Sequence, residues 1–189
     1  MKTTILCILS FSIYFAANAQ KTWELDNLHS NIRFEVGWEE FSVRTGEFKV
    51  FSGTMETSGI EDLSDASFDI NVDPASIDVI AERLNKTLRS ETFLDTAKYK
   101  EITYKTSAIE KTSDSTYVAT GTLNLHGIEQ EEITVIKKTG LSSRNGKHTM
   151  GIKVNLTINR KDYELTWGGD RLADQVEIIG YFLFRTSIR

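Results

Sequence analysis

From Trp23 onward, apolar and polar side chains alternate with a period of two along most of the chain. In one clear case, Ile32, Phe34 and Val36 are separated by polar residues. Alternation of this kind predicts β-strands with one apolar face and one solvated face. The pattern indicates strands at residues 31–36, 47–50, 67–72, 102–104, 117–125, 133–135, 152–158 and 178–184. About eight strands, joined mostly by short turns, predict an antiparallel sandwich or barrel.

The last predicted strand, residues 178–184, differs from the others because apolar side chains occupy both of its faces. Such a strand needs a cover outside the sheet. One candidate is a short helix at residues 79–89, where Ile80, Leu84 and Leu88 recur every four residues and Asp78 can cap the first turn. The other candidate is a second copy of the chain, and the sequence leaves both covers open.

Composition narrows the class of protein. The 189 residues include 27 acidic and 22 basic side chains, which give a formal net charge of −5 and a pI near 5.3. An acidic chain lacks the basic surface expected of a nucleic-acid binder or of a protein adsorbed on an anionic membrane. The hydrophobic fraction of 40% is typical of a globular chain, and the absence of repeats and linkers predicts one domain.

Residues 1–19 have the pattern of a cleaved secretory signal peptide. A short positive start precedes the apolar stretch 5–17, which is too short to span a bilayer, and small residues follow at Ala17 and Ala19. We therefore expect cleavage before Gln20 and a periplasmic or secreted protein. Loss of Lys2 takes the net charge from −5 to −6. The only cysteine, Cys7, lies in this leader, so residues 20–189 offer no thiol for catalysis, disulfides or metal binding.

Catalytic and metal-binding patterns are weak. His29-Ser30 is not part of a Gly-x-Ser-x-Gly elbow, and adjacent residues of an extended chain point to opposite faces. The three histidines, His29, His126 and His148, do not share the spacing of a metal site. We expect His29 to bond locally at a strand start and His126 to be satisfied by backbone groups in a turn. The sequence predicts no enzyme, no catalytic or metal site and no cofactor.

Two features point to ligand binding without deciding it. Arg83, Lys86 and Arg89 follow one flank of the predicted helix, where they are either a solvated flank or cations for an anionic head group. Eight phenylalanines and three tryptophans also remain after the leader, and several fall on the inward strand faces. An eight-stranded barrel either fills its interior with such side chains or leaves room for a long apolar ligand.

Short motifs occur in a fixed order along the chain. They are Leu25-Asp26-x-x-His29-Ser30-x-Ile32-x-Phe34, Gly46-x-Phe48-x-x-Phe51-x-Gly53, Ala75-Ser76-Ile77-Asp78, Leu88-Arg89-Ser90-x-x-Phe93-Leu94-Asp95, Ala97-Lys98-Tyr99, Gly121-x-Leu123-x-Leu125-His126-Gly127 and Asn159-Arg160-x-Asp162-Tyr163. The ordered set, spread over residues 22–188, resembles the YceI-like family of secreted lipid-binding proteins. Two positions depart from the family pattern, which commonly has histidine in place of Trp38 and proline in place of Lys100.

The resemblance implies a lipocalin-like, extended, antiparallel eight-stranded β-barrel, closed over by a loop that bears one short helix. Its implied function is to bind polyisoprenoids, such as polyprenyl phosphates or isoprenoid quinones, in an apolar tunnel without covalent chemistry. Strand parity and the helix stripe then select the residues expected to line or close the tunnel, which are Phe34, Phe48, Phe68, Leu84, Leu88, Phe93, Leu94 and Tyr99. Arg83, Lys86 and Arg89 are the head-group candidates.

The expected partners are an isoprenoid lipid, a membrane in transient contact and, since the family is often dimeric, a second copy of the chain; no nucleic-acid partner is expected. One alternative is a barrel with a filled interior that serves as a structural or stress-related interaction module. A hydrolase that uses His29 or His126 is a third reading of the same chain.

Overall fold

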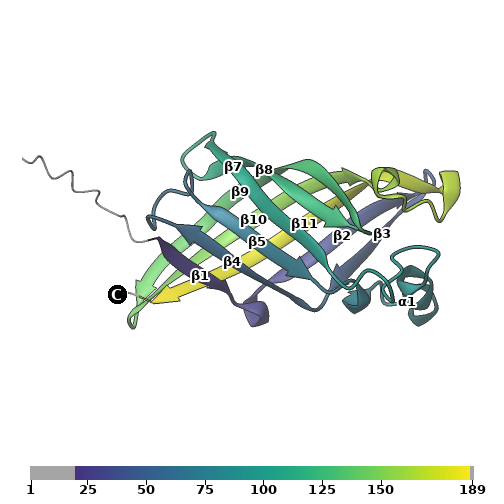
Figure 1. Ribbon diagram of the computed structural model, residues 1–189, viewed down its shortest axis with the longest axis horizontal. Helices are drawn as coiled ribbons and strands as arrows, with labels where there is room; N and C mark the ends of the chain where they lie inside the picture. Colours follow the sequence, from purple (N-terminus) through teal and green to yellow (C-terminus); the bar gives the residue numbers. More distant parts are fainter. Residues whose placement is uncertain (1–19, 188–189) are drawn as a thin grey trace, which may run out of the picture.

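The computed structural model describes residues 20–187, which form a closed antiparallel β-barrel with one helix (Figure 1). The predicted leader, residues 1–19, lies outside the described residues. The elements are β1 (Lys21–Leu25), β2 (Asn31–Trp38), β3 (Ser42–Phe48), β4 (Phe51–Thr57), β5 (Ser67–Val72), β6 (Ile77–Asp78), α1 (Glu82–Arg89), β7 (Ile102–Lys111), β8 (Thr116–Leu125), β9 (Ile128–Arg144), β10 (Lys147–Asn159) and β11 (Leu172–Ser187). No helix among residues 20–187 is both long and apolar enough to cross a bilayer.

The barrel wall follows the order β1-β4-β5-β7-β8-β9-β10-β11 and closes where β1 pairs with β11. At the closure, Glu24 and Leu25 lie opposite Arg185 and Phe184. β2, β3 and β6 continue β1, β4 and β5 beyond short breaks, so the wall has eight strands, of which three are interrupted. The eight-stranded antiparallel barrel expected from the sequence is therefore confirmed.

The breaks in neighbouring strands lie beside one another. β5 and β6 are separated by a 3₁₀ turn at Pro74–Ser76, where the Asp73 carboxylate accepts a hydrogen bond from the Ala75 backbone N–H at 2.8 Å. The Asp73 N–H in turn donates to the carbonyl oxygen of Val50, which lies in the break between β3 and β4. A proline at this position costs no ladder hydrogen bond, because the chain has already left the strand.

This break corrects one detail of the sequence pattern. Phe48 and Val50 were expected to share the inward face of one strand, but Val50 is 57% exposed. β3 ends at Phe48 and β4 begins at Phe51, so the alternation shifts by one residue and Phe51 takes the inward place. The short strand β1 and the strand β4 were not predicted.

The helix is shorter than expected. α1 begins at Glu82 rather than at residue 79, and Ile80 is 96% exposed with a left-handed backbone (φ 59°). Asp78 does not cap α1; its carboxylate accepts hydrogen bonds from the backbone N–H of Ile80 at 2.8 Å and from the Asn85 amide at 3.0 Å. These bonds fold residues 78–81 into a loop, which turns Ile80 out of the apolar stripe.

The two ends of the barrel differ. At the helix end lie α1 and the β2–β3, β8–β9 and β10–β11 connections, and at the opposite end lie residue 20 and the end of β11 (Figure 1). The half of the interior toward the opposite end is packed solid with side chains that have no exposed surface, among them Trp23, Met55, Tyr117 and Phe184. Leu63, from the β4–β5 connection, is also fully buried in this cluster.

The outer face of β11 is not covered by α1, which lies at the helix end. Tyr181 is 38% exposed on this face, and the cations of Arg33 and Lys153 lie 5.7 and 5.5 Å from its ring centre. Of the two covers that the sequence left open, the helix is thus excluded. A second copy of the chain stays a prediction.

Replacing Phe184 with alanine should lower the free energy of unfolding by about 3–5 kcal/mol, because the ring is fully buried and its removal leaves a cavity. Tyr181→Ala, on the outward face of the same strand, should cost less than about 1 kcal/mol. Urea unfolding followed by tryptophan fluorescence measures both changes. If both variants lose the same free energy of unfolding, the half of the barrel at the opposite end is not tightly packed.

Candidate ligand-binding site

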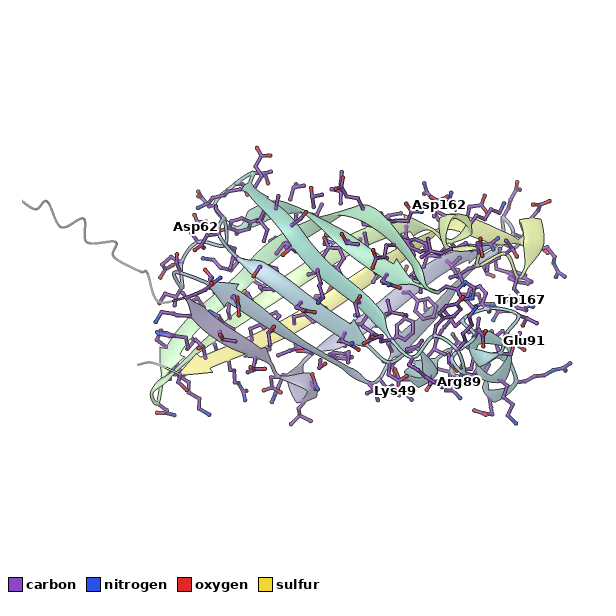
Figure 2. All side chains as sticks on the ribbon, viewed as in Figure 1. Lys49, Asp62, Arg89, Glu91, Asp162 and Trp167 are labelled. Atoms are coloured by element: carbon purple, nitrogen blue, oxygen red, sulfur yellow. The ribbon has the colours of Figure 1, made fainter. Side chains whose placement is uncertain are left out.

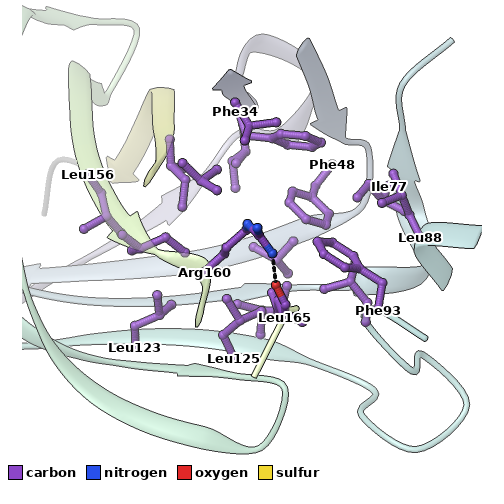
Figure 3. Close-up of a pocket in the computed structure, with 18 of the residues that line it drawn as sticks. Phe34, Phe48, Ile77, Leu88, Phe93, Leu123, Leu125, Leu156, Arg160 and Leu165 are labelled. Carbon is purple, nitrogen blue, oxygen red and sulfur yellow. Dashed lines mark hydrogen bonds between the residues drawn. The ribbon is translucent and has the colours of Figure 1, made fainter. Parts of the chain in front are cut away.

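The half of the barrel toward the helix end contains an apolar cavity of about 310 Å³ (Figure 3). Its wall comes from strands on every side of the barrel and from α1 with the segment that follows it. The aliphatic and aromatic side chains that line it are Ile32, Phe34, Val36, Trp38, Phe48, Ile70, Val72, Ile77, Val79, Leu84, Leu88, Phe93, Leu94, Ile102, Tyr104, Leu123, Leu125, Val154, Leu156, Ile158, Leu165, Trp167, Leu172, Val176, Ile178 and Phe182. The other lining residues are Arg44, Thr134, Arg160 and Gly180.

The residues expected to line or close a tunnel fall into two groups. Phe34, Phe48, Leu84, Leu88, Phe93 and Leu94 all line the cavity, whereas Phe68 and Tyr99 do not. Phe68 faces inward as expected, but it lies in the filled half with its ring 5.8 Å from that of Phe184. Tyr99 packs on His126, with ring centres 4.5 Å apart, outside the cavity. Strand parity identifies an inward face but not the position along the barrel, so it does not distinguish Phe68 from the residues that line the cavity.

Glycine makes room for the aromatic wall near α1. A side chain at Gly46 would collide with the ring of Phe34 and with Val79. Phe34 and Phe48 fill this space, with ring centres 5.7 Å apart. The aromatic wall is thus built by β2 and β3 together, and Leu88 and Phe93 line the same cavity (Figure 3).

The three basic residues proposed for the head group do not line the cavity. Arg83 and Lys86 are exposed, and the Arg89 guanidinium donates to the carbonyl oxygen of Ile77 at 2.7 Å. α1 turns its leucines toward the cavity, so the cations on the flank of the same helix point elsewhere. Arg89 instead borders a separate polar depression together with Lys49 and Asp78, whose side chains form an ion pair.

Arg160 closes the helix end of the barrel. Its side chain is 1% exposed and lies where β10 ends, and its guanidinium reaches across the connection to β11. It donates to the backbone carbonyl oxygens of Leu165 (the dashed line in Figure 3), Trp167 at 3.2 Å, Gly169 at 2.8 Å, Leu172 at 2.9 Å and Ala173 at 2.9 Å. A sixth contact, at 3.4 Å, joins Nη2 to the carboxylate of Asp174.

One buried guanidinium therefore satisfies five backbone carbonyl groups, three in the β10–β11 connection and two at the start of β11. We call the β10–β11 connection, residues 160–171, the lid of the cavity, and Arg160 holds it in place. All three nitrogens of its guanidinium are engaged, so no N–H group is left for a ligand. The motif Asn159-Arg160-x-Asp162-Tyr163 was noted in the sequence, but the role of its arginine was not. A buried arginine can be recognised only when the acceptors around it are known.

Two hydroxyl groups lie at the inner limit of the cavity. Thr134 Oγ1 donates to the Tyr104 hydroxyl at 2.9 Å, and both residues line the wall. The Tyr104 phenol is uncharged at neutral pH even with its ordinary pKa, and burial raises that pKa further. The Tyr104 ring lies over Gly121, where an added Cβ would come within 2.6 Å of it. This pair is the main polar feature deep in an otherwise apolar wall.

A second buried tyrosine supports the lid from outside the cavity. Tyr163 is fully buried, and its hydroxyl donates to Glu132 Oε1 at 2.7 Å. Burial, together with this carboxylate, raises the pKa of Tyr163 far above its ordinary value. The phenol therefore remains a proton donor throughout the physiological range.

The histidines have local roles. His29 Nδ1 lies 3.0 Å from the Asp26 carboxylate, and His126 Nδ1 donates to the carbonyl oxygen of Tyr163 at 3.1 Å in a left-handed turn. Both local bonds agree with the sequence-based expectation. His148 is buried near Trp23 and bonds to the Ser143 hydroxyl at 2.6 Å. Within residues 20–187, no three His, Cys, Asp or Glu side chains gather as a metal site would require.

Fold and cavity define the class: a small closed antiparallel barrel with an apolar interior site, of the general lipocalin-like architecture. The YceI-like domain matches residues 23–182 of this chain. The chain therefore belongs to the YceI-like family, as the ordered motifs predicted.

Individual relatives agree with this assignment. A UPF0312 protein of Yersinia pestis is 26% identical over 174 residues, which cover 90% of this chain and 88% of the relative. A UPF0312 protein of Pectobacterium atrosepticum is 25% identical over 95% of both chains. The crystal structure of Burkholderia cenocepacia BcnA superposes with a TM-score of 0.74 at 20% identity, covering 84% of this chain and 98% of that one.

A further solved structure is described as a polyisoprenoid binding domain from Saccharophagus degradans, implicated in plant cell wall breakdown. Its TM-score is 0.66 at 19% identity, with 87% of this chain and 98% of that chain covered. At this level of identity the likeness establishes a shared fold.

Replacing Arg160 with methionine should lower the free energy of unfolding by at least about 3 kcal/mol, because several buried carbonyl groups would lose a charged donor. Amide hydrogen exchange of residues 160–172 should accelerate most. The neighbouring Lys161→Met removes an exposed cation that pairs with Asp174 at 2.9 Å, and it should cost less than about 1 kcal/mol. If amide hydrogen exchange of residues 160–172 is unchanged in Arg160→Met, Arg160 does not hold the lid in place.

Proposed function

We propose that this protein binds a long-chain isoprenoid lipid in the cavity at the helix end and carries or stores it without covalent chemistry. The observation that supports the proposal is the cavity itself: about 310 Å³, preformed, and lined almost entirely by aliphatic and aromatic side chains. Sites for small hydrophobic molecules are typically concave, mostly apolar and provided with few polar groups. Membership of the YceI-like family and the structural likeness to a polyisoprenoid binding domain are consistent with this function.

The driving force is removal of hydrocarbon from water. Each buried methylene contributes roughly 0.8 kcal/mol, so the length of chain inside the cavity sets most of the affinity. Branched isoprenoid methyl groups suit a wall of leucine, isoleucine, valine and phenylalanine side chains, which offer close van der Waals contact. No group of the site is needed as a nucleophile or base for this function.

The alternative, a barrel with a filled interior that acts as an interaction module, describes only the opposite half. There Trp23, Met55, Tyr117 and Phe184 leave no exposed surface. We propose that this half provides stability, and that the hollow half provides the function. A periplasmic or secreted location, transient contact with a membrane and a homodimer are parts of the same proposal that the sequence suggests.

The direct test is native mass spectrometry of the purified protein, before and after delipidation and incubation with farnesol or geranylgeraniol. We expect one isoprenoid molecule to be retained on each chain. Protein that stays empty with every isoprenoid offered would overturn the proposal.

Filling the cavity should abolish binding while the fold is retained. Leu156 lines the cavity from β10, whereas Val135 lies on the outer face of the neighbouring β9 and is 40% exposed. Leu156→Trp should weaken farnesol binding at least about tenfold, because the larger side chain takes the space of the ligand. Val135→Trp, the matched control, should leave binding within about twofold. Displacement of a fluorescent fatty alcohol measures both, and equal effects would place the ligand outside the barrel.

Chain length offers a second test of the site. In a series of isoprenoid alcohols, affinity should rise with each added unit and then level off, because the filled half stops the chain beyond Tyr104 and Phe182. Isothermal titration calorimetry across the series locates the plateau. Affinity that rises without limit would indicate a tunnel through the whole barrel, contrary to the dense packing of the half at the opposite end.

A further inference from the structure

The cavity reaches the surface at a guanidinium group that the fold does not use. Arg44 lies on β3 opposite Val36 of β2, and Val36 is a buried, inward-facing residue. Directly paired residues of an antiparallel ladder point to the same face, so Arg44 starts on the inner face of the sheet. Among the residues that line the cavity, Arg44 is the one that is well exposed to solvent, so it lies at the mouth.

Arg44 is held against an aromatic ring. Its guanidinium carbon lies 5.8 Å from the ring centre of Trp38, which also lines the cavity. A second guanidinium, that of Arg171, lies over the same ring at 4.8 Å, but it is paired with the Glu39 carboxylate at 2.8 Å. Stacking on a ring orients a guanidinium and leaves its edge N–H groups free for other partners.

The two arginines of the cavity wall differ in what they can still bind. Every nitrogen of Arg160 donates to carbonyl or carboxylate oxygens of the lid. Arg44 makes no ion pair and no side-chain hydrogen bond within residues 20–187. Arg44 is thus a cation at an inward strand position, beside Val36 and the aromatic wall, where it contributes little to packing.

We propose that Arg44, oriented by Trp38, binds the anionic head group of the ligand, a phosphate or a carboxylate, at the mouth of the cavity. This inference rests on the function proposed above and adds the charge and direction of the ligand: the hydrocarbon lies inside and the anion at the β2–β3 end. The planar guanidinium can give two parallel hydrogen bonds to either oxyanion, which a lysine cannot. The overall charge of the chain is negative, so attraction of an anion must come from a local group such as this one.

The test compares farnesyl phosphate with farnesol, which carry the same hydrocarbon. Wild-type protein should bind the phosphate about tenfold more tightly, as expected for one solvent-accessible charge-assisted contact. Arg44→Gln should remove this preference by weakening farnesyl phosphate about tenfold, with farnesol changed less than about twofold. Arg44→Lys should retain only part of the preference, because it restores the charge but not the planar fork. Calorimetry at low and moderate salt should show the preference shrinking as salt rises.

Matched controls separate this contact from general charge. Arg171→Gln removes the other cation beside Trp38, and Arg83→Gln removes an exposed cation on α1 that does not line the cavity. Both should keep the preference for farnesyl phosphate within about twofold. Inorganic phosphate is the probe for a free-anion site, and it should compete with farnesyl phosphate only weakly, because it lacks the buried chain.

The outcomes distinguish failure of the proposed lipid binding from failure of the head-group assignment to Arg44. If neither farnesol nor farnesyl phosphate binds, the proposed lipid function fails. If both bind equally to wild-type protein, or if Arg44→Gln leaves the preference intact, the head-group assignment alone is wrong. Inorganic phosphate that binds as tightly as farnesyl phosphate would overturn the assignment in favour of a free-anion site.

Discussion

Closure of the hydrogen-bonded ladder between β1 and β11 is the constraint on which the rest of the structure depends. Once Leu25 lies opposite Phe184, the sheet is a ring, and every strand of the wall has one face directed into a common interior. Every inward residue of the alternating pattern then faces this interior, where it either packs against other side chains or borders a cavity. The protein uses both solutions, one in each half of the barrel.

The two halves divide stability and binding between them. Large side chains without exposed surface, such as Trp23 and Phe184, interlock in the half toward residue 20 and the end of β11. Dense packing of this kind stabilises a fold but offers no room for a ligand. In the other half the wall is just as apolar, but it remains hollow because α1 and the β10–β11 connection roof it over instead of filling it. Figure 2 shows Trp167 and Arg89 near this roof and Asp62 at the far end.

The β10–β11 part of this roof is held by polar contacts as well as by apolar packing. A connection between strands carries backbone carbonyl groups that find no ladder partner, and burial without a partner is costly. Arg160 satisfies five such carbonyl groups with one side chain, and the Tyr163 hydroxyl ties the same segment to Glu132 on β9. Arg44, the other cation of the lining, takes no part in these contacts within residues 20–187.

The sequence by itself determined the strand pattern, the barrel class, the family and a part of the cavity wall, because a period of two and a set of ordered motifs are local properties of the chain. Phe34, Phe48, Leu84, Leu88, Phe93 and Leu94 were identified in this way. It did not separate Phe68 from them, since depth along the barrel depends on register with Phe184 and its neighbours. Only the tertiary structure decided which cations face the cavity, because that choice follows from helix orientation and strand pairing, which bring Arg44 beside Trp38 and turn Arg83 and Lys86 to solvent.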